Sequence, residues 1–282
     1  MAEITPGMVG KLREMTGAGL MDCKRALVES NGDIEAAVDS LRKKGVATAG
    51  KKAAREAREG VIAQNVQPGA RVGVLVEINC ETDFVARNDS FKAFCDDIAK
   101  KLAAHPGVDL EADRVAAVAK IGENIKISRH TRMEVAGHGL VAAYIHTGAK
   151  VGVLVEVGAG KDSTVASEEF KQLVKDITLQ IAAAHPNAVS REQVPVEVIA
   201  KEREIAAQSD RLKGKPPQAM EKILKGVLDK FYQTYCLVDQ GFVKKNSEVS
   251  VKEHLGQVAK QLGDEITIRR FVRFQVGESA AA

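Results

Sequence analysis

The sequence predicts an α+β protein in which a small helical domain precedes a duplicated body of antiparallel sheets covered by helices. Two observations lead to this prediction. Apolar residues recur at helical spacing between residues 5 and 45. Beyond residue 60 the chain repeats itself, and each copy combines strand-like runs with an amphipathic helical pattern. Because a sheet with an apolar face is stable when helices cover it, two related subdomains are expected.

The composition is that of an ordinary globular protein, with 45% hydrophobic and 28% charged residues among 282. The formal net charge of +3 falls short of the concentrated basic face of a dedicated nucleic-acid binder. The N-terminus lacks a basic region followed by an apolar stretch, and no run of about 18 apolar residues occurs. Neither a signal peptide nor a membrane span is therefore expected. The four cysteines lie far apart without a C-x-x-C pair, which is typical of buried thiols in a cytoplasmic protein.

Residues 1–45 are expected to form a domain of three short helices. The segments TGAG (16–19) and SNGD (30–33) supply glycines that permit tight reversals, and Asp33 is placed to cap the third helix. The apolar positions of the three helices are Met8, Leu12, Met15, Leu20, Cys23, Leu27, Ile34, Ala37, Val38 and Leu41. A domain of this size buries little core, so it is expected to be marginally stable alone.

Residues 46–59 are rich in lysine, arginine, alanine and glycine, and they are expected to form a basic, solvated linker or an exposed helix. An RNA-binding arm is the alternative, although no aromatic residue lies between the basic ones to stack on bases. A ribosome-associated RNA-binding protein is therefore a competing class. Its affinity for RNA would fall steeply with salt, which distinguishes it from a protein that binds through an apolar side chain.

The first repeated element has the pattern strand, glycine turn, strand. GVIAQNVQPGARVGVLVEI (60–78) aligns without a gap to GLVAAYIHTGAKVGVLVEV (139–157). An amphipathic helix follows in each copy, because FKAFCDDIAKKLAAHP (91–106) matches FKQLVKDITLQIAAAHP (170–186) with one inserted residue. One face of each helix is expected to pack on the preceding hairpin.

The third repeated element closes each copy with a strand. LGDEITIRRFVRFQV (262–276) resembles IGENIKISRHTRMEV (121–135), and its alternation of apolar and polar residues is typical of a strand. The first subdomain is therefore expected to span residues 60–138, and the second residues 139–276.

The second copy carries an insertion at about residues 190–236. Two helical patterns flank GKPP (214–217), whose glycine and prolines end one helix and begin the next. A projecting helical hairpin is expected, and a segment folded back on the core is the alternative. The tail at 277–282 is expected to be flexible.

The two copies differ in the segment that follows the hairpin. The gap-free alignment places Thr82–Val85 opposite Lys161–Thr164, so the shared fold accepts Ser163 where the first copy has Phe84. Leaving a phenyl ring in water forgoes roughly 1.5–3 kcal/mol of burial. Phe84 is therefore expected to be covered, either by its own domain or by another protein.

Thr82 is placed to cap a short helix that carries Asp83 to Arg87. Such a helix would project the side chains of Asp83 and Phe84 together from one rigid turn. An acid beside an aromatic ring suits the disruption of a packed, charged site on a partner.

Catalytic and nucleotide-binding motifs are weak or missing. The chain has no G-x-x-x-x-G-K-[ST] motif, and no cysteine or histidine has a partner at metal-ligand spacing. His105 and His185 occur at repeated A-H-P helix ends, where capping is expected, and His146 falls in the exposed turn of the second hairpin. A small-molecule enzyme is the third candidate class, but no catalytic set, cofactor or metal site is predicted for it.

Several segments together resemble the elongation factor Ts family, and the resemblance spans nearly the whole chain. These segments are LREMTGAGLMDCKRAL (12–27), NGDIEAAVDSLRKKG (31–45), TDFVARND (82–89), KIGENI (120–125), YIHTGAKVGVLVE (144–156), GKPPQAMEKILKG (214–226) and KFYQTYCLVDQGFVK (230–244). The resemblance implies a UBA-like helical domain, a coiled-coil insertion, and the role of guanine-nucleotide exchange factor for elongation factor Tu.

The resemblance also implies how exchange works. The segment Thr82, Asp83, Phe84 and Val85 matches the family's exchange motif, in which the acidic and aromatic side chains enter the GTPase near its Mg²⁺ and weaken GDP binding. Further contacts are implied at Arg13, His146 and Gly148. The nucleotide and Mg²⁺ belong to the partner, so the chain itself is expected to need no cofactor, nucleic acid or membrane, and to catalyse no chemical step.

Overall fold

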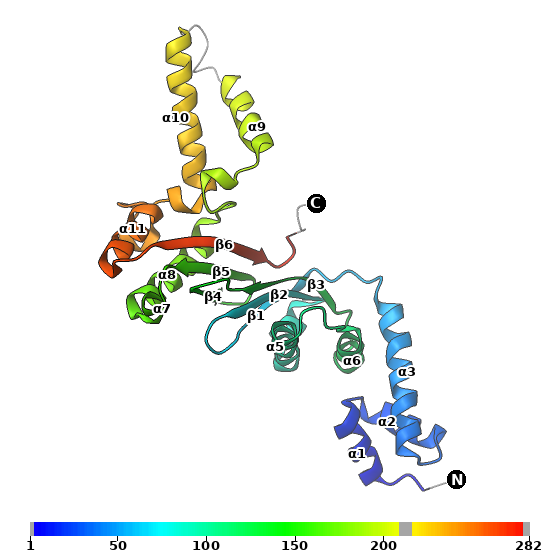
Figure 1. The fold of residues 1–282 in the computed structure, drawn as a ribbon. Coiled ribbons are helices and arrows are strands. Elements are labelled where there is room, and N and C mark those ends of the chain that lie inside the picture. Colours follow the sequence, from blue (N-terminus) through cyan, green and yellow to red (C-terminus); the bar gives the residue numbers. More distant parts are fainter. Residues whose placement is uncertain (1–2, 209–215, 279–282) are drawn as a thin grey trace.

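The computed structural model of the protein describes residues 3–208 and 216–278. It combines α-helices with two three-stranded antiparallel sheets, so the predicted α+β class is confirmed. Figure 1 shows an extended molecule, with the N-terminal helices at one end, the sheets in the middle and the helices of the insertion projecting at the other end.

The three N-terminal helices form a small unit that we call the head. They are α1 (Pro6–Thr16), α2 (Leu20–Glu29) and α3 (Ile34–Lys52). Asp33 caps α3 as predicted, because its carboxylate accepts a hydrogen bond of 3.1 Å from the backbone N–H of Ala36. The buried core of the head consists of Val9, Leu12, Cys23, Ala26, Leu27 and Ala37.

Two apolar residues of the head do not join this core. Met15 is 59% exposed and Leu20 is 54% exposed, although both fit the helical spacing of the apolar face. They flank the turn between α1 and α2, where the chain leaves the packed helix faces. Helical periodicity alone did not distinguish them from core residues.

Helix α3 does not end near residue 45, where the basic linker was expected to begin. It continues to Lys52 and packs along α6 (Glu111–Ile121). A Cβ atom at Gly45 would lie 3.6 Å from both Ala119 and Val115, and Ala49 is 1% exposed. Residues 46–52 therefore form the exposed-helix alternative, in which Ala49 is a packing residue whereas Ala47 and Gly50 are exposed.

The two subdomains repeat one topology, with strand orders β1-β2-β3 and β4-β5-β6. The first sheet consists of β1 (Glu59–Val66), β2 (Val72–Cys80) and β3 (Lys126–Glu134). The second consists of β4 (Gly139–Ile145), β5 (Val151–Ala159) and β6 (Ile266–Gln275). The covering helices are α5 (Asp89–Ala104) and α6 in the first subdomain, and α8 (Glu168–Ala184) and α11 (Val251–Leu262) in the second.

Each sheet has its helices on one face and the other sheet against the opposite face. Strand β2 is buried at every residue for this reason, and its sequence is almost continuously apolar. The apolar layer between the sheets consists of Ile62, Leu75, Met133, Val135, Val141, Leu154 and Phe274. The contact is pseudo-symmetric, because Ile62 N–H donates to the Ala149 carbonyl at 2.7 Å and Val141 N–H donates to the Ala70 carbonyl at 2.8 Å.

Two glycines at equivalent repeat positions let the sheets meet. A Cβ atom at Gly73 would lie 2.5 Å from Val141 Cγ1, and one at Gly152 would lie 2.5 Å from Ile62 Cγ2. Neither distance is compatible with normal packing, so both positions require the absence of a side chain.

The insertion in the second subdomain forms two helices, α9 (Val196–Ala207) and α10 (Pro217–Tyr235). They project away from the sheets in Figure 1, as expected for a hairpin rather than a folded-back segment. Helix α10 begins at Pro217, the last residue of the predicted helix break. The remaining residues at the tip, and most of the predicted flexible tail, lie outside the described part of the chain.

Arg191 holds the base of this hairpin. Its guanidinium contacts Asp239 Oδ1 at 2.8 Å and Asp229 Oδ1 at 2.9 Å, and it lies 4.6 Å from the ring centroid of Tyr232. The first carboxylate follows the hairpin, whereas the other two groups belong to α10. The arginine therefore ties the hairpin to the second subdomain.

The sheet interface leads to a stability prediction. Gly73→Ala is expected to lower the free energy of unfolding by about 1–3 kcal/mol, because the added methyl group overpacks the layer between the sheets. Urea unfolding followed by circular dichroism measures the change. Gly256→Ala is the matched control: a Cβ atom at this exposed glycine of α11 would meet nothing within 4 Å, so a neutral or slightly stabilising effect is expected. Equal stability of the two variants would contradict the interpretation.

Candidate functional site

The segment after β2 forms a short helix whose first turn is capped as the sequence predicts. Helix α4 (Asp83–Arg87) begins after Thr82, whose hydroxyl accepts a hydrogen bond of 3.3 Å from Val85 N–H. Val85 packs partly buried against the core of the first subdomain, and Ala86 is 4% exposed. The helix is therefore anchored on one side by its own apolar residues.

Phe84 points away from this anchor. Its side chain is 82% exposed, the largest fraction among the exposed large apolar residues of the described chain. The sequence left open whether the ring is covered by its own domain. In the structure its own subdomain leaves it in water.

Asp83 lies beside the ring and is held by a local ion pair. Its Oδ2 atom is 3.0 Å from Arg87 Nη2, one helical turn later, and its side chain remains 44% exposed. Such an exposed pair adds little to stability, but it limits the rotamers of the acid. The turn therefore presents a carboxylate and an aromatic ring side by side.

A residue that the sequence analysis did not nominate, Glu123, fixes the start of this turn. Its carboxylate accepts hydrogen bonds from Glu81 N–H at 2.9 Å, from Thr82 N–H at 3.0 Å and from the Thr82 hydroxyl at 2.6 Å. Hydrogen bonds to an ionised acceptor are stronger than neutral ones. We call residues 81–88, held in this way, the clamped loop.

Comparison of the two sequence repeats could have identified Glu123 as a residue that holds the loop. The residue lies in KIGENI, which aligns with LGDEI in the second copy, so Asp264 occupies the equivalent position. Asp264 accepts hydrogen bonds from Gly160 N–H at 3.1 Å and Lys161 N–H at 3.0 Å. Both copies thus clamp the segment after their second strand with a carboxylate from the turn before their last strand.

The buried thiol of Cys80 also contacts the clamped loop. Its thiol donates to the Thr82 carbonyl at 3.2 Å. Burial raises the pKa of this thiol to about 12, and the nearby charge of Glu123 acts in the same direction. The group therefore stays protonated at neutral pH and acts as a buried donor rather than as a nucleophile.

The equivalent segment of the second subdomain lacks the ring. Helix α7 (Asp162–Ala166) follows Lys161, which makes no side-chain capping bond, and Ser163 is exposed. Asp162 contacts His138 Nδ1 at 2.7 Å. The two copies therefore share a helical turn after the hairpin, and only the first uses it to expose a large apolar side chain.

The other predicted contact residues lie on different parts of the molecule. Arg13 is exposed on α1, and the apolar side chains of Met15, Leu20 and Met21 are exposed beside it in the chain. His146 and Gly148 lie in the β4–β5 turn, where His146 is exposed and Gly148 has a φ of 86°. The structure does not bring these residues together with Phe84 into one pocket.

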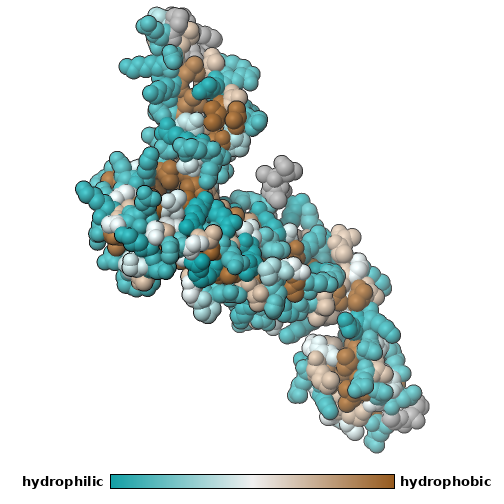
Figure 2. Space-filling view, viewed as in Figure 1, coloured by the Kyte–Doolittle hydropathy of each residue, from teal (hydrophilic) through white to brown (hydrophobic). Residues whose placement is uncertain are grey.

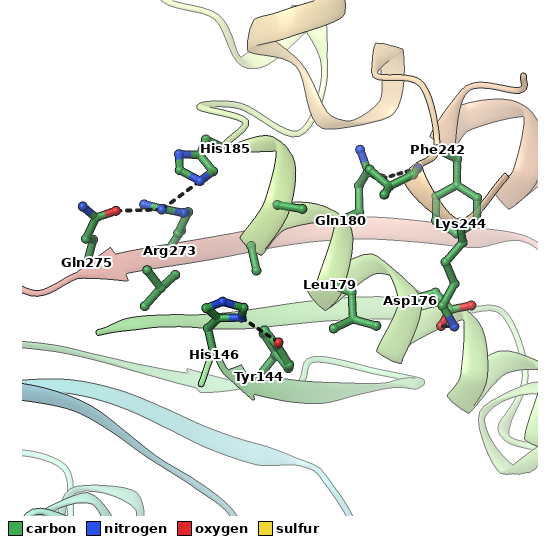
Figure 3. Close-up of a pocket in the computed structure, with 14 residues that line it drawn as sticks. Tyr144, His146, Asp176, Leu179, Gln180, His185, Phe242, Lys244, Arg273 and Gln275 are labelled. Atoms are coloured by element: carbon green, nitrogen blue, oxygen red, sulfur yellow. Dashed lines mark hydrogen bonds and ion pairs between the residues drawn. The ribbon is translucent and has the colours of Figure 1, made fainter. Parts of the chain in front are cut away.

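His146 lies at the edge of a pocket of about 470 Å³ on the second subdomain. Figure 3 shows the Tyr144 hydroxyl and His146 Nδ1 joined at the strand end, a contact of 2.9 Å. Arg273, His185 and Gln275 also line the pocket, and Arg273 Nη2 contacts His185 Nε2 at 3.0 Å and Gln275 Oε1 at 2.9 Å. Phe242 and the aliphatic residues of α8 complete a mostly apolar lining. The pocket suits an apolar side chain of a partner.

Apolar surface gathers in separate places in the view of Figure 2. Brown residues appear on the projecting hairpin and on the head, with hydrophilic surface over much of the molecule between them. Val196 and Ile205 of α9 are 76% and 55% exposed. A partner that covers the exposed apolar residues must therefore be large.

Several of the cations in and just before the expected linker contact acceptors within the chain. Lys44 pairs with Asp22 at 2.6 Å, and Lys52 donates to the Gly122 carbonyl. The shorter linker that follows α3 contains Arg55, 3.6 Å from Glu81. These contacts occupy charges that an RNA-binding arm would present to phosphates.

Neither a metal centre nor a membrane-spanning helix emerges in the part of the chain that the structure describes. In residues 3–208 and 216–278, no three side chains of histidine, cysteine, aspartate or glutamate gather as metal ligands would. No helix in the same ranges has the length and apolarity that crossing a bilayer requires.

Comparison with known proteins identifies the family. A family model described as elongation factor TS matches residues 81–278. An elongation factor Ts of Symbiobacterium thermophilum is 47% identical, with 99% of this chain and 93% of the relative covered. Those of Nostoc punctiforme and Nitratidesulfovibrio vulgaris (strain DP4) are 43% and 41% identical, with 99% of this chain and 94% and 98% of the relatives covered.

These matches place the protein among the factors of translation elongation. The chain belongs to the elongation factor Ts family. The clamped loop lies within the matched region.

The clamp leads to a second prediction. Glu123→Ala is expected to speed amide hydrogen exchange at Glu81 and Thr82, and to lower the free energy of unfolding by about 1–3 kcal/mol, because both N–H groups lose their acceptor. Exchange followed by NMR or mass spectrometry measures the first effect. Asp264→Ala is the matched control, since it should loosen residues 160–161 and leave 81–82 unchanged. Unaltered protection at Thr82 in Glu123→Ala would show that Glu123 does not hold the loop.

Proposed function

We propose that the protein is a guanine-nucleotide exchange factor that binds elongation factor Tu in its GDP-bound state, disturbs the Mg²⁺ site of that GTPase and promotes GDP release so that GTP binds. One observation carries the proposal. In a chain of this family, Phe84 is 82% exposed on a loop that Thr82 caps and Glu123 clamps. A large ring kept in water on a rigid turn is best explained by burial in a partner.

The energetics favour insertion of this ring. Burying a phenyl side chain contributes roughly 1.5–3 kcal/mol. Because α4 is capped at Thr82 and clamped through Glu123, little conformational freedom is lost when the loop binds. The free energy gained when the Phe84 ring is buried therefore offsets the cost of separating packed elements of the partner.

The carboxylate of Asp83, next to the ring, is suited to disturb the Mg²⁺ site of the partner. Mg²⁺ requires near-ideal octahedral oxygen coordination, and in GTPases it is held by phosphate oxygens and few protein groups. The side chain of Asp83 would bring a negative charge and a steric load close to that shell. A displacement of the ion would weaken its neutralisation of the GDP phosphates and so favour release of the nucleotide.

Exchange is reversible for a thermodynamic reason. If the factor weakens nucleotide binding by a given ratio, bound nucleotide weakens the factor by the same ratio. Incoming GTP then displaces the factor. The chain needs no nucleophile and no cofactor of its own, and its place of action is the cytoplasm, where translation elongates.

Additional surfaces supply affinity in this proposal. Arg13 and its exposed apolar neighbours offer one contact, and the turn of His146 and Gly148 beside the second-subdomain pocket offers another. We take the head to be a UBA-like domain and the projecting helices to be a coiled-coil arm. Linking several modest contacts in one molecule raises affinity well beyond that of any single contact.

Phe84 is the first residue to test. Phe84→Ala is expected to slow stimulated GDP release from elongation factor Tu by roughly thirtyfold, which corresponds to loss of about 2 kcal/mol at a binding hot spot. Fluorescent GDP release in stopped flow measures the rate. The circular dichroism and melting temperature should not change, because the side chain is exposed. Ser163→Ala at the equivalent repeat position is the control and should be as active as the parent. Full activity of Phe84→Ala would exclude the ring as the inserted group.

Asp83 tests the second half of the mechanism. Asp83→Ala is expected to reduce the same rate at least about fivefold, the effect of losing more than 1 kcal/mol. Asp162→Ala removes the equivalent acid from the second copy and is expected to leave exchange unchanged. An Asp83→Ala variant as fast as the parent would mean that the ring acts without the carboxylate.

A further inference from the structure

Asn124, next to the clamp residue, is fully buried and joins distant parts of the chain. Its side-chain amide donates to the backbone carbonyl of Arg55 at 2.7 Å and to that of Ala53 at 3.4 Å. Its own N–H donates to Glu81 Oε1 at 2.6 Å. One asparagine thus contacts the segment that leaves the head and the residue that opens the clamped loop.

Neighbouring contacts strengthen the same connection. Lys52, the last residue of α3, donates to the Gly122 carbonyl, and the guanidinium of Arg55 lies 3.6 Å from Glu81 Oε1. Glu123 meanwhile holds Thr82. The turn at 122–124 therefore holds the end of α3 on one side and the clamped loop on the other.

Packing between α3 and α6 makes the connection stiff. Helix α3 packs along α6, where even an added Cβ atom at Gly45 would lie at an ordinary 3.6 Å from Val115 and Ala119, and Ala49 is buried in the core of the first subdomain. Close packing of small residues leaves little room for rocking. The turn and this contact together define the direction in which the head leaves the subdomain.

The second copy shows that the shared fold does not require an asparagine here. Asn124 aligns with Glu265 in LGDEI, and Glu265 is exposed. The second copy keeps the clamping carboxylate, as Asp264, but has no head to hold. The two copies therefore differ at the position whose side chain contacts the head segment.

We propose that Asn124 is a positioning residue that fixes the head relative to the clamped loop, so that the head and Phe84 engage one partner molecule at the same time. This inference rests on the proposed exchange function. When two contact surfaces are held at a fixed spacing, the second contact forms without a further loss of orientational freedom. A head that swings freely would bind the partner less effectively, although the loop itself would be intact.

The direct test measures head orientation and exchange in the same variants. Asn124→Ala and the isosteric Asn124→Asp are made in the full chain, the latter because a carboxylate cannot donate to the two carbonyls. Spin labels at Lys24→Cys on the head and Lys100→Cys on α5 report the distance between the two parts by electron-spin resonance, without any partner. The distance distribution is expected to be narrow in the parent and broad in both variants.

Exchange kinetics provide the functional half of the test. The half-saturating concentration of the factor for stimulated GDP release is expected to rise about tenfold in both variants, equivalent to roughly 1.4 kcal/mol. The rate at saturation should change by less than about twofold, because Glu123 still clamps the loop. Glu265→Ala at the matched position should alter neither the distances nor the kinetics.

The outcomes separate this inference from the proposed function. A narrow distribution in both Asn124 variants, or a broad one with an unchanged half-saturating concentration, overturns the positioning role. A drop in the saturating rate comparable to that of Phe84→Ala also overturns it, because Asn124 would then act on the loop itself. If the parent stimulates no release at all, the exchange function fails, and with it the role of Asn124 in exchange, whereas the distance measurement still decides whether Asn124 holds the head.

Discussion

The function of this molecule depends on one constraint: a phenyl ring must be kept in water at a fixed position. Collapse of the ring onto its own subdomain would regain roughly 1.5–3 kcal/mol, so something must prevent it. The structure does so by holding the backbone on both sides of Phe84. Thr82 caps the turn, Glu123 binds the N–H groups that precede it, and Val85 and Ala86 anchor the opposite face.

Duplication explains how such a loop coexists with a stable fold. The two sheets meet through glycines at matching positions, Gly73 and Gly152, and each copy closes its own helix-covered core. Stability therefore resides in elements that both copies share. The connecting segments differ at positions that the shared packing does not restrict, so Phe84 faces Ser163 in the alignment, and Asn124 faces Glu265.

Much of this architecture was predictable from the sequence. Periodicity predicted the helices, the internal alignment predicted both sheets, and comparison of the copies singled out Phe84. Contacts between residues distant in the chain were not predictable, which is why Glu123 was missed although its segment was noted. Ala49 fell within the expected linker or exposed helix because the subdomain core that buries it lies far along the chain. Met15 and Leu20 fitted a helical face, yet they lie exposed beside a turn.

The central claim is that the ring of Phe84 leaves water only when the partner arrives. Fluorine NMR of 4-fluorophenylalanine incorporated at position 84 tests it most directly. The free protein is predicted to give one narrow signal with a full solvent isotope shift between H₂O and D₂O. On addition of GDP-bound elongation factor Tu, the signal should broaden, move and lose that isotope shift. A ring that is shielded from solvent in the free protein, or that still contacts solvent in the saturated complex, would contradict the account.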